Sequence, residues 1–170
     1  REHALQQRRW LETDAAAQQL RDWRDELQGL EPLELPADRD AAPGAPVRGD
    51  RRGRDLGDGA RWLAAARSLG VTPFMWFLSG FGVLLHRLCG ADDVAIGAPV
   101  AGREPRYRST VGFFVGSLCL RLDCRGAPDF AAFAAAVRRR CLWAYDRQAL
   151  PFERLVEALA PERHPTRHPL

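Results

Sequence analysis

Residues 111–123 read VGFFVGSLCLRLD, and this stretch decides the fold class that the sequence predicts. Every second residue from Phe114 to Leu122 is apolar except Gly116, which is the spacing that places side chains on one face of a strand. Gly116 and Ser117 are small, so they mark a bulge or a close backbone approach in the middle of the strand. We therefore predict a long strand with one apolar face.

Two amphipathic helices are expected after this strand. Residues 150–157 read LPFERLVE, in which Pro151 begins a short helix with apolar residues at helical spacing. Before it, Asp129 is placed to cap a longer helix. The apolar stripe of that longer helix comprises Phe130, Phe133, Val137, Cys141 and Tyr145.

A central helix and another strand precede the stretch. Thr72 is placed to cap the helix and Pro73 occupies its first position. Residues 74–89 are apolar nearly all the way round, which predicts a helix buried on every side. Gly80 and Gly82 within it predict that another backbone packs closely there. Residues 94–100 are typical of a short buried strand, and a polar loop follows at 103–110.

The first 70 residues alternate helix and linker. Residues 3–28 carry apolar positions at helical spacing, so we expect one amphipathic helix ended by Gly29. Residues 31–46 contain four prolines and are predicted to be a crossing linker. Residues 47–56 allow a short strand, although Gly and Arg dominate them. Residues 60–69 form an Ala-rich helix that Gly70 ends in the left-handed conformation.

Composition bounds the class of protein. The chain has 170 residues and 46% apolar content, enough for one domain with a core. All 25 basic residues are arginine, and the net charge of +3 is too small to indicate nucleic acid or an anionic membrane. The cysteines at 89, 119, 124 and 141 form no Cys-x-x-Cys pair, so a reducing cytoplasm is expected. Residues 71–85 are too short a run for a membrane span.

Histidines offer little chemistry by themselves. His86 lies among leucines on the apolar helix, which favours a core or edge histidine with one hydrogen bond over catalysis. His164 and His168 have the spacing of a helical metal pair, but Pro165 between them disfavours a continuous helix, and no third ligand is in view. No metal site is predicted.

Three other motifs have an ordinary structural interpretation. Ser79 lacks the glycine two residues earlier that a nucleophile elbow needs, so we expect a helix residue in tight packing. Gly80 and Gly82 lie inside a helix, and the third glycine of a dinucleotide-binding fingerprint is missing after them, so no dinucleotide site is predicted. The arginine run at 138–140 has the charge to meet a phosphate, but such a run on a helix is usually a solvated face.

The stretches at 111–121 and 150–157 resemble the condensation domain of nonribosomal peptide synthetases. The resemblance extends, in the same order, over residues 23–35, 72–87, 92–103 and 161–170. That family folds as two lobes, each similar to chloramphenicol acetyltransferase, with a tunnel between them. The resemblance implies an α/β fold in which this chain is the second lobe, a mixed sheet with packed helices, incomplete at both ends.

The resemblance also implies an organisation and a reaction. Residues 1–170 are expected to be part of a condensation domain, with a lead-in helix at 1–30, a Pro-rich linker at 31–46 and the core of the second lobe at 47–170. The parent protein would form an amide bond between a donor acyl thioester and an acceptor amine. Both substrates arrive on the 4′-phosphopantetheine of peptidyl carrier protein domains, next to an adenylation domain, and no cofactor is bound directly.

Site residues follow from the same resemblance. The family's active-site motif, HHxxxDG, appears nowhere in the chain, so no catalytic residue is assigned and the isolated chain is expected to be inactive. Phe114, Gly116 and Ser117 are placed near the substrate tunnel, although completing a sheet explains them equally well.

Departures from the family pattern leave three functions open. The family usually has Asn-Thr in place of Gly116-Ser117, His-Gln-Asp in place of residues 147–149, and other spacing residues in place of His164-Pro165. A peptide-bond-forming condensation domain is favoured. An epimerisation or cyclisation domain of the same superfamily, and a vestigial carrier-docking domain without catalysis, are the alternatives.

Overall fold

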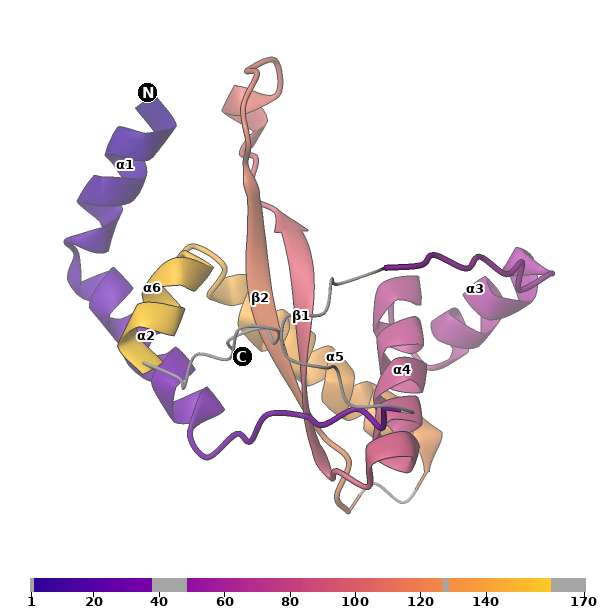
Figure 1. The fold of residues 1–170 in the computed structure, drawn as a ribbon. Helices are drawn as coiled ribbons and strands as arrows, with labels where there is room; N and C mark the ends of the chain where they lie inside the picture. Colours follow the sequence, from indigo (N-terminus) through magenta and orange to yellow (C-terminus); the bar gives the residue numbers. More distant parts are fainter. Residues whose placement is uncertain (1, 38–48, 127–128, 160–170) are drawn as a thin grey trace.

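A two-stranded antiparallel hairpin forms the centre of the molecule (Figure 1). The computed structural model describes residues 2–37, 49–126 and 129–159. Strand β1 (Asp93–Ala101) pairs with β2 (Val115–Asp123) in an unbroken register that runs from Asp93 opposite Asp123 to Ala101 opposite Val115. Helices accompany this sheet, so the predicted α/β class is confirmed.

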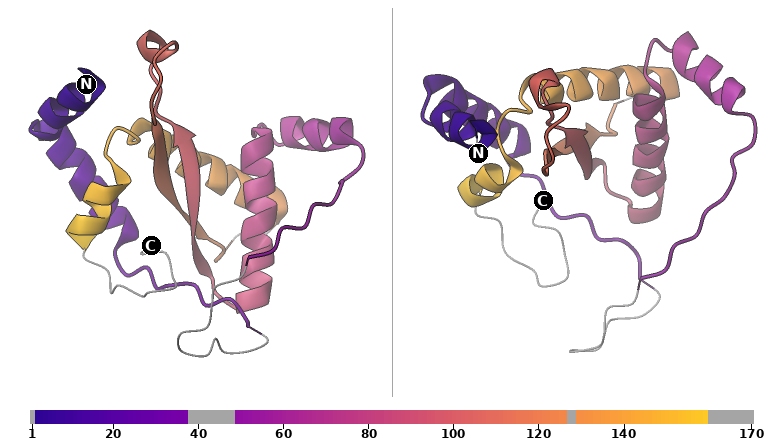
Figure 2. Two further views of the ribbon diagram at one scale, coloured as in Figure 1. Left: turned by 45° about the horizontal axis from the view of Figure 1, so that its top comes forward. Right: turned by 90° about the horizontal axis from the view of Figure 1, so that it is seen from above.

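Helices surround the hairpin on three sides. Helix α5 (Phe130–Asp146) crosses behind it, while α4 (Pro73–Cys89) stands on the β1 side. Helices α2 (Asp14–Leu27) and α6 (Phe152–Leu159) lie together on the β2 side, as both views in Figure 2 show. Two outer helices, α1 (Glu2–Leu11) and α3 (Gly59–Ser68), extend from α2 and α4. The hairpin loop, with a short 3₁₀ turn at Pro105–Tyr107, projects beyond all of them.

The core joins β2, α5 and α2. Leu120 and Leu122 of β2 are 1% exposed, and they pack with the buried stripe of α5. Trp23 of α2 is 2% exposed, its ring lies 4.8 Å from that of Trp143 of α5, and its Nε1 donates to the carbonyl oxygen of Arg147 at 3.2 Å. The segment predicted as a lead-in therefore contributes to the same core as the sheet.

The predicted helix ends are confirmed at four places. The hydroxyl of Thr72 accepts from the Met75 amide at 3.2 Å, and Pro73 is the first residue of α4. Asp129 accepts from the Ala132 amide at the start of α5. Gly70 follows α3 with φ of +65°, the left-handed conformation in which glycine has no steric cost. Residues 152–159 form the predicted short helix α6.

The single helix predicted over residues 3–28 is wrong, because the chain forms α1 and α2 with a break at Thr13. The Thr13 backbone is extended, and its side chain accepts from the Ala16 amide at 3.3 Å as the cap of α2. A threonine followed by an acidic residue competes with continued helix by capping a new one. The strand allowed at 47–56 is not formed in its described part, residues 49–56.

The bulge predicted at Gly116-Ser117 is also absent, since the register passes through both residues without an extra one. Strand β2 begins at Val115 rather than Val111, because residues 111–114 belong to the hairpin loop. A Cβ at Gly116 would lie 3.4 Å from Cγ2 of Val100, an ordinary contact.

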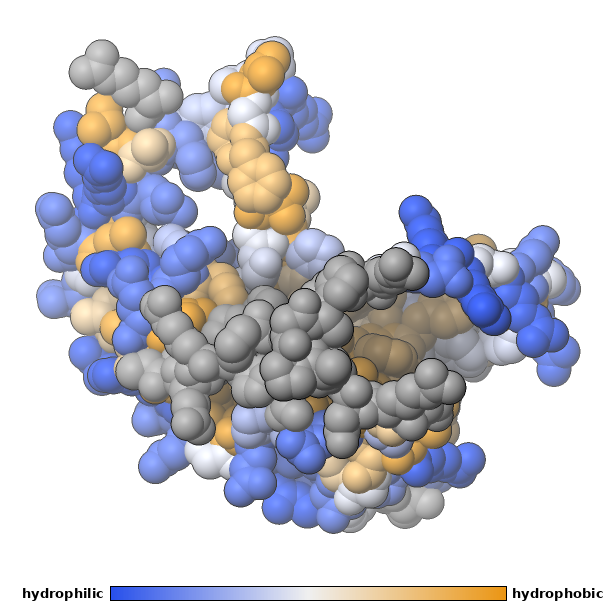
Figure 3. Space-filling model, in the orientation of Figure 1, coloured by the Kyte–Doolittle hydropathy of each residue, from blue (hydrophilic) through white to orange (hydrophobic). Residues whose placement is uncertain are grey.

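Helix α4 is not buried on every side, contrary to the prediction. Helix α5 and β1 cover one face of it, and the opposite face carries a row of side chains that are 43–54% exposed in the described structure. Apolar surface shows in the recess between the hairpin and α3 (Figure 3). The apolar row comprises Phe74, Phe77, Phe81, Leu84 and Leu88.

No single helix among the described residues is long and apolar enough to cross a bilayer. Helices α3 and α4 meet that criterion only when taken together, and they are bent by 89° at the break between them.

The two glycines of α4 have different surroundings, which gives a matched test of packing. A Cβ at Gly82 would lie 2.9 Å from Cδ1 of Leu122 and 3.2 Å from Cζ of Phe133, both buried side chains. Gly80 has open space. The close partner is thus a pair of side chains at Gly82 and not a second backbone.

We expect Gly80→Ala to be more stable than Gly82→Ala by about 1–3 kcal/mol, the usual cost of overpacking a core. The gain in helix propensity is the same in both variants and cancels in the comparison. Urea denaturation of the two variants measures the difference. Equal free energies of unfolding would show that Leu122 and Phe133 move aside without cost.

Candidate functional site

An apolar groove of about 430 Å³ lies where the start of α4, the end of β1 and the end of α5 meet. The groove brings together three segments that are far apart in the sequence. It is lined by Phe74, Ala98, Pro99, Val100, Ala101, Tyr145 and Gln148. The sequence analysis placed Tyr145 in the apolar stripe of α5 and Gln148 in a stretch that departs from the family pattern, but it assigned neither of them, nor Phe74, to a site. Phe74 and the β1 residues lie in segments that carried the family resemblance.

The position of Gln148 depends on its neighbour Arg147. The guanidinium of Arg147 donates to Oδ2 of Asp22 at 2.8 Å, and it lies 4.4 Å from the centre of the Trp143 ring. Its carbonyl accepts from Trp23. These contacts fix the C-terminal end of α5 against α2, and Gln148 follows directly at the groove.

The groove is suited to binding and not to proton transfer. Its polar side chains are those of Tyr145 and Gln148, and burial raises the pKa of the Tyr145 phenol further above neutrality. An amide and a protonated phenol donate and accept hydrogen bonds without exchanging charge at pH 7. The remaining lining residues are apolar, and the groove is open to solvent.

The structure does not bring the three predicted tunnel residues into one pocket. Phe114 lies in the loop just before β2, where its ring stacks on Tyr107 at 5.6 Å. Gly116 and Ser117 pair with Val100 and Pro99, two residues of the groove, and Ser117 is exposed. Because successive residues of a strand face opposite sides, Gly116 and Ser117 lie on different faces of the hairpin.

The condensation domain family model matches residues 1–170. The chain belongs to the condensation domain family. The resemblance to condensation domains of nonribosomal peptide synthetases is thereby confirmed.

Similar proteins support the assignment. The chain is 44% identical over 155 residues to phosphinothricin tripeptide synthetase PhsB of Streptomyces viridochromogenes, covering 87% of the chain and 13% of that protein. Two solved structures match with a TM-score of 0.81. SgcC5 of Streptomyces globisporus is 29% identical, and the match covers 94% of the chain and 36% of SgcC5. The X-domain from teicoplanin biosynthesis is 27% identical, with 98% and 39% covered.

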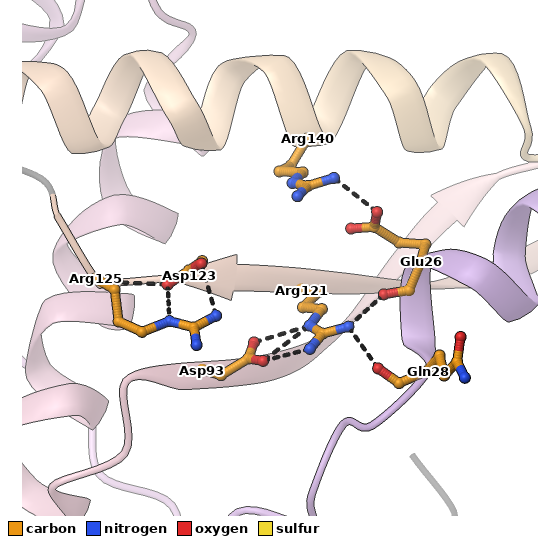
Figure 4. Close-up of polar contacts among 7 residues, drawn as sticks. All are labelled: Glu26, Gln28, Asp93, Arg121, Asp123, Arg125 and Arg140. Carbon is orange, nitrogen blue, oxygen red and sulfur yellow. Dashed lines mark hydrogen bonds and ion pairs between the residues drawn. The ribbon is translucent and has the colours of Figure 1, made fainter.

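Arg121 ends the stretch of residues 111–121 that carried the resemblance, and the structure assigns it a structural task (Figure 4). Its guanidinium donates to both carboxylate oxygens of Asp93 on β1, with distances of 2.5–3.0 Å. Nη1 donates to the carbonyl oxygens of Glu26 at 2.6 Å and Gln28 at 3.0 Å. One half-buried side chain therefore ties both strands to the end of α2.

The residues considered for other chemistry have structural partners. The hydroxyl of Ser79 is buried and donates to the Met75 carbonyl at 2.7 Å, as expected of a helix residue in tight packing. Nδ1 of His86 lies 3.0 Å from the Ala91 carbonyl oxygen and 3.3 Å from Oδ1 of Asp92, so a carboxylate accompanies the predicted single hydrogen bond. No cluster that could hold a metal ion occurs among the described residues, and His164 and His168 lie outside them.

The arginine run of α5 is exposed, as predicted, and one member has a partner. Arg140 donates to Oε2 of Glu26 at 2.6 Å, which adds a second link between α5 and α2 (Figure 4). Arg125, in the turn after β2, pairs with Asp123 at the end of that strand at 2.8 Å, and its side chain is 62% exposed.

We expect Arg121→Ala to lower the free energy of unfolding by about 2–4 kcal/mol, because it leaves the half-buried Asp93 charge and two carbonyl groups without their donor. Arg125→Ala is the matched control, since it breaks an exposed pair at the end of β2 and should cost no more than about 1 kcal/mol. Chemical denaturation of both variants tests this. Equal losses would contradict the structural role of Arg121.

Burial makes two of the four free cysteines poor nucleophiles. It raises the pKa of Cys119 to about 12 and that of Cys141 to about 11, so neither thiol ionises near neutral pH. Iodoacetamide at pH 8 should therefore modify Cys89 in the folded chain and reach Cys119 and Cys141 only after denaturation. Peptide mass spectrometry measures the modification, and labelling of all three at one rate would contradict the assignment.

Proposed function

We propose that the chain forms part of a condensation domain that joins a carrier-bound acyl thioester to a carrier-bound amine. The observation that carries the proposal is the match of the whole chain to the condensation family. In this reaction the amine nitrogen attacks the thioester carbonyl carbon and the C–N bond forms. The C–S bond breaks, and the departing thiolate takes up the proton that the amine loses.

The contribution of this chain to the reaction is positional. Holding two reactants in attack geometry replaces a bimolecular encounter by an effectively unimolecular step and removes several kcal/mol from the barrier. The groove beside β1 offers apolar walls and two neutral hydrogen-bonding groups, and Gly116 on the paired strand leaves space next to Val100. We assign the groove, with Gly116, to one wall of the substrate passage, and we place Phe114 and Ser117 beside that passage, Ser117 on the other face of the hairpin.

Proton transfer is assigned to residues outside this chain, since its sequence lacks HHxxxDG. The isolated chain is accordingly proposed to be inactive. The exposed apolar row of α4 supports a larger domain, because monomeric proteins rarely expose contiguous apolar surface of this kind. The matched solved structures are also longer than the chain.

Partners and compartment follow from the same proposal. Peptidyl carrier domains would present both substrates on 4′-phosphopantetheine, and an adenylation domain would load the carrier. All four cysteines are free, which supports a reducing cytoplasm.

Filling the passage tests the proposal in the full synthetase that contains this chain. Ala101 is an exposed residue of the groove, and Ala101→Trp should lower kcat/KM for amide formation about tenfold or more by displacing the reactants. Ser117→Trp probes the other face of the hairpin. Ser68→Trp, on an exposed serine at the end of α3, is the control and should act like wild type. Full activity of both Ala101→Trp and Ser117→Trp would overturn the wall assignment.

A second candidate is a docking domain without catalysis. The match to the X-domain from teicoplanin biosynthesis favours it, because a solved complex of that X-domain and OxyB also matches the chain, with a TM-score of 0.76 and 29% identity. The departures at Gly116-Ser117 and Arg147 point the same way. If loaded carrier proteins bind the synthetase and no product forms, the docking function is favoured over amide formation.

A further inference from the structure

The loop between β1 and β2, residues 102–114, is organised around one side chain. Nη1 of Arg103 donates to the carbonyl oxygen of Tyr107 at 2.8 Å and to that of Thr110, and Nη2 donates to that of Gly112 at 3.1 Å. Three carbonyl groups spread along the loop thus share one planar donor. Such charge-assisted bonds are stronger than neutral ones, and the fork of the guanidinium fixes their relative directions.

The same guanidinium holds the ring that ends the loop. Its central carbon lies 4.1 Å from the centre of the Phe114 ring, which in turn stacks on Tyr107 with an angle of 27° between the planes. Tyr107 is 6% exposed and its hydroxyl donates to Oε1 of Gln6 of α1 at 2.7 Å. A backbone hydrogen bond joins the two ends of the loop, because the Gly102 amide donates to the Phe114 carbonyl at 2.9 Å.

Glycine is required at position 102 for this closure. A Cβ there would lie 2.6 Å from the Phe114 carbonyl oxygen. The loop so held presents two apolar side chains to the outside, Val111 at 99% and Phe113 at 86% exposed. Apolar surface shows at the top of Figure 3, where the hairpin ends. Because Val111 and Phe113 are exposed, the conformation of the loop comes from the hydrogen bonds of Arg103 and from the stack of the buried Tyr107 on Phe114.

We propose that Arg103 is a positioning residue, which fixes the loop and the Phe114 ring where β2 enters the wall of the substrate passage. The inference rests on the proposed function. Arg103 acts through Phe114 and the loop backbone, and it does not touch the substrate or the reacting atoms. A lysine cannot replace it, since a single ammonium group lacks both the fork and the flat face that lies on Phe114.

Hydrogen exchange and transfer kinetics of the full synthetase test the inference together. In Arg103→Ala, the Thr110 amide, which donates to the Tyr107 carbonyl, should exchange about tenfold faster or more, because the loop opens locally. The kcat for amide formation should fall about tenfold, with KM for the loaded carriers changed by less than about twofold, because positioning is lost and carrier docking is not. Relative to Arg103→Ala, Arg103→Lys should improve the exchange rate and kcat by no more than about threefold each.

Arg108→Ala is the matched control, an exposed arginine of the same loop, and it should leave exchange and kcat at wild-type values. Unchanged exchange in Arg103→Ala, or a kcat equal to that of Arg108→Ala, would overturn the inference while leaving the proposed function intact. A wild-type synthetase that forms no amide would overturn the proposed function, and with it the tunnel role of the loop. In that case faster exchange in Arg103→Ala would still show that Arg103 holds the loop.

Discussion

The rest of the structure depends on the packing of one face of β2 against α5. Leu118, Leu120 and Leu122 present consecutive apolar side chains to Phe133 and its neighbours on the helix, and all of them are nearly or fully buried. Burial of such side chains contributes about 1.5–3 kcal/mol each. A hairpin alone is only marginally stable in water, so this contact turns two strands into a scaffold.

The groove is a consequence of that packing. Because β1 is paired with β2 along its whole length, its last residues are carried to the point where α5 ends and α4 begins. Phe74 reaches the same point because Thr72 and Pro73 fix where α4 starts. The lining residues of the groove therefore lie on or beside three packed elements, which fix their positions.

Local patterns were sufficient where the cause is local. Interactions within a few residues produce the alternating pattern of β2, the apolar stripe of α5 and the helix caps at Thr72 and Asp129. All of these features are present in the structure. The break at Thr13 was missed because the helical spacing of apolar residues continues on both sides of Thr13. That spacing hid the tendency of Thr13 to cap a new helix. The exposed row of α4 could not be foreseen, since an apolar residue in a sequence does not say which of its possible partners lies beside it.

The site was harder to predict for the same reason, and the arginines show it best. Arg121 meets carbonyl groups that precede it by 93 and 95 residues, and Arg147 meets a carboxylate 125 residues away. Neither pairing has a signature in the local sequence. Both guanidinium groups, and that of Arg103, are occupied by carbonyl groups, carboxylates or aromatic rings of the chain itself. These three arginines stabilise the geometry of the chain, and their charges are not free to attract an anionic ligand. Under the proposed function, a chain whose arginines are used in this way, and whose groove is lined by a neutral amide and a neutral phenol, would hold reactants in place and leave proton transfer to residues elsewhere.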